Sequence, residues 1–248
     1  MYKTELMQAN HHFNEGEHKE AAELYTIICL HRPLHEVPKK TLIAASRTLG
    51  FQLSNGIGIE KNPRRAVQMY RIAVALDDPA STCNLASMWF DGVPSINKAT
   101  KEPSTVVLRQ DPIRGANLLG RLLSRVSYVP AIVELGRCYF TGEGVAFDPA
   151  RATELWTRAE KLAISGKTDQ TKEELVPAIA EAQRALKEVR MLGANPKKFA
   201  DYQEQTLEEN ATQAGRYGPY TSPWGAAGYV QFLRSKHVKV TTVTENIR

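Results

Sequence analysis

Five of the six histidines, the side chains best suited to bind a metal ion or carry a proton at neutral pH, lie in the first 35 residues. They are His11, His12, His18, His31 and His35. Neighbours such as His11 and His12 face different directions on a helix, and no His-Glu-x-x-His signature accompanies them. We interpret the histidines as exposed or half-buried helix residues, so the sequence predicts no metal site, no cofactor and no catalytic residue.

The three cysteines are the next candidates for chemistry. They are Cys29, Cys83 and Cys138, and each lies in an apolar run of helical character. They are far apart in the chain, and no pair has the spacing of metal ligands. This pattern predicts small buried side chains in a reducing compartment.

Two Gly-x-Gly segments, at 56–58 and 142–144, could cradle a phosphate group if they belonged to a nucleotide-binding loop. Neither follows an expected strand, and neither completes Gly-x-Gly-x-x-Gly, because Lys61 and Phe147 occupy the last position. We interpret both as tight turns, in which glycine supplies backbone angles that other residues avoid. The sequence therefore indicates a protein that is not an enzyme.

Composition and charge limit the kind of partner. The 248 residues are 42% hydrophobic and 24% charged, as in ordinary globular proteins. No apolar run approaches the roughly 18 residues of a membrane span, and the N-terminus lacks the apolar core of a secretory signal, so we expect an intracellular chain. Residues 211–248 hold five of the bases and one acid, a net charge of +4 within a total of +5, which leaves +1 for residues 1–210. A nearly neutral body argues against a broad nucleic-acid surface.

The elements that would position these residues form a repeat. Residues 45–73 and 131–159 match at a constant offset of 86. The matched pairs are Leu49-Gly50 with Leu135-Gly136, Gly56-x-Gly58 with Gly142-x-Gly144, Asn62-Pro63 with Asp148-Pro149, Arg65-Ala66 with Arg151-Ala152, and Tyr70 with Trp156. This pattern predicts a first helix with a close-packing glycine, a tight turn, and a second helix capped by Asn or Asp with proline at its first position. We expect Tyr70 and Trp156 to fill the space between hairpins.

A degenerate middle copy follows the first at offset 36, with Leu85-Ala86, Trp89 and Gly92. Its second helix starts late, at Asp111-Pro112. The intervening residues 93–110 are rich in Pro, Ser, Lys and Thr and are expected to form an enlarged loop inserted between the two helices. Such an insert is either a partner-binding device or tolerated slack.

Further helices flank the repeats. Small and apolar residues predict a helical hairpin near the N-terminus; they include Ala9, Phe13, Gly16, Ala21, Tyr25 and Pro33. Residues 173–192 read as a helix, with a start near Val176 because Pro177 fits only near a helix start, and with an end at Gly193. Residues 196–213 are expected to form another helix. Together, residues 164–214 would cap the open end of the repeats.

The stretch Ala131–Ala163 resembles a nearly complete Sel1-like repeat, and Ala45–Ala73 resembles a second. The middle copy departs from the pattern in its loop. The resemblance covers roughly residues 4–163 and implies an all-α, right-handed superhelical solenoid of helical hairpins, related to tetratricopeptide repeats, with a partly extended C-terminal tail. It also implies an adaptor or scaffold for protein complexes.

Two surfaces are candidates for partner binding. The first is the groove lined by the first helices, where the candidate residues are Arg47, Phe51, Ser87, Phe90, Arg137 and Phe140. This aromatic and cationic set suits a peptide or helix with acidic residues, although the phenylalanines could instead pack between hairpins. The second is the tail, residues 215–248, where the candidates are Arg216, Tyr217, Tyr220, Trp224, Tyr229, Phe232, Arg234, Lys236 and Lys239. We expect this tail to fold on its own solenoid, on a protein neighbour or on RNA.

The sequence thus predicts a non-catalytic scaffold subunit that mediates protein–protein contacts in a large intracellular assembly. The basic, aromatic tail favours a ribonucleoprotein such as an organellar ribosome, and the mitochondrion over the cytoplasm. The alternative is a free-standing peptide-binding adaptor in signalling or protein quality control. Co-sedimentation with a large particle distinguishes the two.

Overall fold

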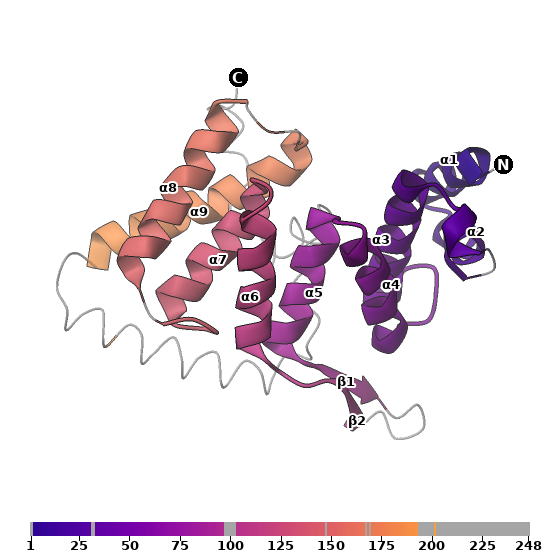
Figure 1. Cartoon of the computed structure of the whole chain (residues 1–248), viewed down its shortest axis with the longest axis horizontal. Coiled ribbons are helices and arrows are strands. Elements are labelled where there is room, and N and C mark those ends of the chain that lie inside the picture. Colours follow the sequence, from indigo (N-terminus) through magenta and orange to yellow (C-terminus); the bar gives the residue numbers. More distant parts are fainter. Residues whose placement is uncertain are drawn as a thin grey trace. The chain divides into compact units, whose positions relative to one another are not determined.

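The computed structural model describes residues 2–30, 33–96, 103–146, 148–166, 168, 170–192 and 201 (Figure 1). These residues divide into two compact units, which comprise residues 1–85 with 92–109, and 86–91 with 110–248. The elements are α1 (Tyr2–Asn14), α2 (His18–Leu30), η1 (Leu34–Glu36), α3 (Lys39–Asn55), α4 (Pro63–Ala75), α5 (Pro79–Asp91), β1 (Val93–Ile96), β2 (Pro103–Leu108), α6 (Pro112–Leu123), α7 (Val129–Thr141), α8 (Pro149–Ile164) and α9 (Lys172–Leu192). The predicted all-α class, built from antiparallel helical hairpins, is confirmed.

Each unit is held together by neighbouring helices. In the first unit, α1 packs on α2, α2 on α3, and α3 on α4. In the second unit, α6 packs on α7, α7 on α8, and α9 lies against both α7 and α8. A continuous core in the second unit joins α7, α8 and α9, with Trp156, Ile132 and Ile179 among its buried side chains.

The close-packing glycines act inside a hairpin. A Cβ atom at Gly136 would lie 2.5 Å from Trp156 Nε1, and one at Gly50 would lie 2.8 Å from Tyr70 Cε1. Trp156 is 2% exposed, and its Nε1–H donates to the Val133 carbonyl at 3.1 Å. The expectation that these aromatics separate successive hairpins is therefore corrected. Each fills the space between the two helices of its own repeat, because the glycine opposite leaves room for the ring.

The turn glycines make the contact between successive hairpins. Gly58 and Gly144 have φ of +69° and +75°. A Cβ atom at Gly58 would lie 2.2 Å from the His18 carbonyl carbon, and one at Gly144 would lie 2.1 Å from the Pro112 carbonyl oxygen. His18 and Pro112 begin α2 and α6, the second helices of the preceding hairpins. Both turns therefore need glycine for its backbone angle and for its lack of a side chain.

An equivalent backbone hydrogen bond closes the loop between the two helices in each of the three repeats. The backbone N–H of the cap residue donates at 2.8 Å to a carbonyl near the end of the first helix; the pairs are Asn62 with Leu53, Asp111 with Trp89, and Asp148 with Tyr139. Each cap side chain also accepts the N–H three residues on, as predicted. The middle repeat thus keeps its local geometry despite the long insert.

The insert, expected from the sequence to be an enlarged loop, contains an antiparallel pair of strands, β1 with β2. At its entry, Gly92 has φ 70° and ψ 170°, whereas the equivalent Gly56 has φ 74° and ψ 35°. The change in ψ sends the chain into a strand in place of a left-handed turn. Val93 and Leu108 are buried at the base of the hairpin, and β1 packs on α4.

The last described helix starts earlier than predicted. α9 begins at Lys172, and Pro177 lies inside it. Proline removes one backbone hydrogen bond, but Leu175 and Ala178 on either side are buried in the core, and the Leu175 N–H donates to the Thr171 carbonyl. Packing of this first part of the helix explains why it extends beyond the expected start. The predictions for Gly193, for the helix at 196–213 and for the tail lie outside the described residues.

Candidate partner-binding face

Equivalent positions of the three first helices carry polar or aromatic side chains, of which Ser87 and Thr141 are buried. The offsets of 36 and 86 residues relate Phe51 on α3 to Ser87 on α5 and to Arg137 on α7. Four residues further along the same helices stand Asn55, Asp91 and Thr141. Residues four apart lie on one face of a helix, so each first helix presents one such pair on the same face of its repeat.

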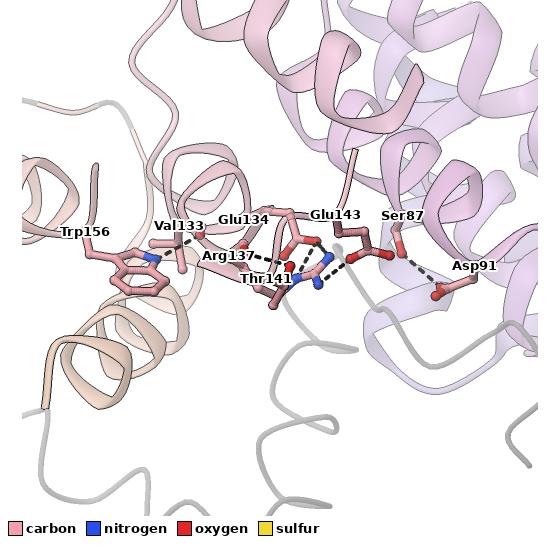
Figure 2. A network of polar contacts seen from close by, with 8 residues as sticks. All are labelled: Ser87, Asp91, Val133, Glu134, Arg137, Thr141, Glu143 and Trp156. Carbon is pink, nitrogen blue, oxygen red and sulfur yellow. Dashed lines mark hydrogen bonds and ion pairs between the residues drawn. The ribbon is translucent and has the colours of Figure 1, made fainter. Parts of the chain in front are cut away.

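In the second unit, Arg137 is the centre of this face (Figure 2). Its guanidinium donates to Glu134 Oε1 from Nη2 at 2.7 Å and from Nε at 3.1 Å, and to Glu143 Oε2 from Nη1 at 2.6 Å. The guanidinium carbon also lies 5.4 Å from the centre of the Phe90 ring, within cation–π distance. Burial disfavours the charge, but Glu134 and Glu143 hold the pKa of Arg137 well above its ordinary value.

Asp91, the last residue of α5, is the third carboxylate at this face. Burial raises its pKa to about 7, Arg137 opposes this shift, and Glu143 and Glu134 add to it. The side chain nevertheless remains accessible to solvent.

The charge of this face differs from the sequence prediction. The prediction of an acidic partner assumed that Arg137 offers a free cation. The structure instead pairs the guanidinium with Glu134 and Glu143 and places Asp91 beside them, so three carboxylates surround one cation. When all are ionised, the group has a net charge of −2.

The other groove candidates are distributed differently. Phe90, Phe140 and Ser87 are buried, and the Phe140 ring lies 5.5 Å from Trp156, edge to face. This favours the interpretation that the phenylalanines pack between helices. In the first unit, Phe51 is half-buried, and Arg47 forms an ion pair with the buried N-cap Asp78 at 3.2 Å. The candidate tail residues lie outside the described part of the chain.

Sequence reasoning missed Asp91, Glu134 and Glu143. A signal for the first two was present, because Asp91 stands four residues after Ser87 and Glu134 stands three residues before Arg137, both helical-neighbour spacings. Glu143 occupies the middle of the Gly142-x-Gly144 turn. Because the segment was interpreted only as a turn, the ion pair of Glu143 with Arg137 was not expected.

The remaining candidates for chemistry are structural where they are described. Cys29, Cys83 and Cys138 are buried and free, and burial raises the pKa of Cys29 to about 12. His12 Nδ1 lies 2.5 Å from Glu17 Oε2 at the surface. Among the residues that the structure describes, no three His, Cys, Asp or Glu side chains are placed to hold a metal ion, and no helix is long and apolar enough to cross a membrane.

Comparison with known proteins agrees with this geometry. The family model for the Sel1 repeat matches residues 49–78 and 129–163, so these two segments are Sel1 repeats. No curated protein matches the sequence.

Two solved structures are similar to the chain. A Sel1 repeat protein from Oxalobacter formigenes has 20% sequence identity, covers 61% of this chain and 92% of its own, and gives a TM-score of 0.41. The second is c5321, a protective antigen present in uropathogenic Escherichia coli strains that displays an SLR fold; it has 16% identity and a TM-score of 0.42. That match covers 94% of this chain and 56% of c5321.

Proposed function

We propose that this chain is a non-catalytic scaffold that binds a protein partner through the α5–α7 face, defined by Asp91, Glu134, Arg137 and Glu143. Sel1-repeat proteins generally mediate protein–protein interactions, which supports the class of function. The observation that carries the location is the recurrence of polar or aromatic residues at equivalent positions of successive first helices. In α5 and α7 these positions bring an accessible carboxylate and a partly exposed guanidinium onto one surface (Figure 2).

The charges of the face favour a partner segment that carries a basic side chain. Asp91 and Glu143 are the carboxylates with access to solvent. Together they carry more negative charge than Arg137 neutralises, and a basic side chain of the partner would balance the remainder. An exposed ion pair contributes less than about 1 kcal/mol, so these charges supply selectivity and association rate more than affinity. Most of the affinity then comes from other contacts of the partner with the repeats.

We further propose that the scaffold is a subunit of a large assembly, with an organellar ribosome or another ribonucleoprotein of the mitochondrion as the favoured setting. The support is compositional: residues 215–248 combine a net positive charge with aromatic side chains that can stack on bases or enter apolar pockets. The free-standing peptide-binding adaptor is the second candidate, and the compact repeat face by itself supports that function equally well.

Native size fractionation, with identification of the co-migrating molecules, tests these proposals. The scaffold proposal expects the chain to migrate with at least one protein in a stable ratio. Co-migration with a large particle, weakened steeply by salt if RNA is bound, supports the assembly. Co-migration with one protein supports the adaptor. Elution of the chain alone in every fraction of its native extract would contradict both.

A further inference from the structure

The sequence of α9 repeats that of α7 at a constant offset of 47 residues, and the match continues beyond the helix. The matched segments are Val129-Pro130-Ala131-Ile132 with Val176-Pro177-Ala178-Ile179, Glu134-x-x-Arg137 with Glu181-x-x-Arg184, and Asp148-Pro149-x-Arg151 with Asn195-Pro196-x-Lys198. The Gly-x-Gly turn is not repeated, because Val189 and Met191 occupy its positions and α9 continues to Leu192. Both the helix pattern and the Asn-Pro pattern of a helix start therefore recur after the last segment that the family model matches.

The packing of α9 is that of a first helix. In the first unit, α3 packs on both helices of the hairpin before it, α1 and α2. In the second unit, α9 likewise packs on both helices of the hairpin before it, α7 and α8. Ala178 and Ile179 are buried, as their counterparts Ala131 and Ile132 are. Matched core positions thus have the same environment in α7 and α9.

The Glu–Arg pair on α9 repeats the geometry of the pair on α7. Arg137 Nη2 donates to Glu134 Oε1 at 2.7 Å, and Arg184 Nη2 donates to Glu181 Oε1 at 2.9 Å. In both pairs the carboxylate is the more buried partner, with side chains 9% and 15% exposed, against 32% and 45% for the arginines. Burial raises the pKa of Glu181, Arg184 lowers it, and Glu134 adds to the rise, so the charges of α7 and α9 act on one another.

One oxygen of the pair on α9 has no partner. Within the described part of the chain, Glu181 Oε2 is buried and receives no hydrogen bond, whereas Oε1 accepts from Arg184. A buried carboxylate oxygen without a donor is costly, and a cationic donor satisfies it best. Rotation of the exposed Arg184 side chain would free this carboxylate for another cation.

We infer that α9 is the first helix of a further Sel1-type repeat, and that its Glu181–Arg184 pair extends the α5–α7 face by one repeat. The inference rests on the proposed function, and the occupant is the same basic segment of the protein partner, which places a second basic side chain at Glu181. Charge supports this occupant, because the extended face holds four carboxylates and two arginines, a net charge of −2 when all are ionised.

The spacing of the two basic side chains follows from the packing of α9 on α7. Packed helices lie about 8–10 Å apart, and an extended chain advances about 3.3 Å per residue. An extended partner segment should therefore carry its two basic residues about three positions apart.

Selection from a random peptide library displayed on phage, with the full chain as the target, tests this inference with a defined probe. The recovered peptides should be enriched in pairs of Lys or Arg about three residues apart. One synthetic peptide of this kind is then measured by calorimetry against the unmodified chain, Glu181→Gln, Glu181→Lys and the control Glu154→Lys, which changes an exposed position on α8. Circular dichroism establishes that each variant is folded, and Glu181→Gln, which keeps the shape of the side chain, serves if Glu181→Lys unfolds.

Both Glu181 variants should weaken the peptide several-fold, up to about fivefold for a partly exposed ion pair, and Glu154→Lys should leave its affinity unchanged. Replacement of one basic residue of the peptide by alanine should cause a similar loss and make the peptide insensitive to Glu181→Gln, because the two changes remove the same contact. Equal affinity for the unmodified chain and the folded Glu181 variants would overturn the inference. If Asp91→Lys weakens the same peptide while the Glu181 variants do not, only the extension to α9 fails. If neither position matters, or if no basic peptides are recovered, the proposed function fails with it.

Discussion

Replacing Gly144 by alanine perturbs two features of the fold at once. The residue has φ +75°, which an L side chain adopts only with strain. The new methyl carbon would lie 2.1 Å from the carbonyl oxygen and 2.5 Å from the carbonyl carbon of Pro112. These are backbone atoms in the first turn of α6, so they cannot move aside as the end of a flexible side chain would. The turn after α7 must separate from α6.

The magnitude follows from two additive terms. The left-handed backbone costs alanine about 1–2 kcal/mol, and overpacking at a rigid contact costs about 1–3 kcal/mol. Gly144→Ala should therefore lower the free energy of unfolding by about 2–5 kcal/mol. Gly166→Ala is the matched control, because Gly166 has φ +63° but no atom within 4 Å of its Cβ position. It should lose only the first term, about 1–2 kcal/mol.

Urea unfolding of the two variants, followed by circular dichroism, measures the difference. Because 1 kcal/mol corresponds to about 2–4 °C for a chain of this size, melting temperatures should separate the variants as well. Equal losses for Gly144→Ala and Gly166→Ala would refute the argument, since they would mean that the turn does not dock on α6.

Two further predictions concern the same hairpins. Trp156→Ala should lower the free energy of unfolding by about 3–5 kcal/mol, because it empties the space opposite Gly136; an unchanged urea midpoint together with lost partner binding would instead make Trp156 a contact residue. Asp111→Ala and Asp148→Ala should each cost about 1 kcal/mol in the same assay, because both remove an N-cap hydrogen bond of equal geometry. A loss confined to Asp148→Ala would show that the middle repeat does not use its cap.

The sequence predicted those parts of the fold that depend on local backbone constraints. The caps Asn62 and Asp148 and the turn glycines Gly56 and Gly142 could be identified because each residue type satisfies a requirement of its own neighbourhood. The strands β1 and β2 were missed because the middle repeat keeps Gly92, whose φ matches that of Gly56 while its ψ differs. The early start of α9 was missed because tertiary packing offsets the effect of a proline.

The candidate face was predicted only in part. Arg137 was identified from its position on the first helix, but its ion pair with Glu143 joins a helix to a turn, and its neighbour Asp91 is 46 residues away in the chain. Charge balance at such a site depends on which side chains meet in space. A pattern confined to one helix therefore indicated Arg137 but not the carboxylates that are paired with it.

The central claim is that the α5–α7 face binds the partner, and charge reversal at Asp91 tests it most directly. Once fractionation has identified the partner, its affinity for Asp91→Lys should be compared by calorimetry with that for Glu154→Lys, the same change at an exposed position on α8. Circular dichroism first establishes that both variants are folded. The account predicts a several-fold loss of affinity for Asp91→Lys, about the fivefold that 1 kcal/mol represents, and an unchanged affinity for Glu154→Lys. Unchanged affinity for Asp91→Lys would contradict it.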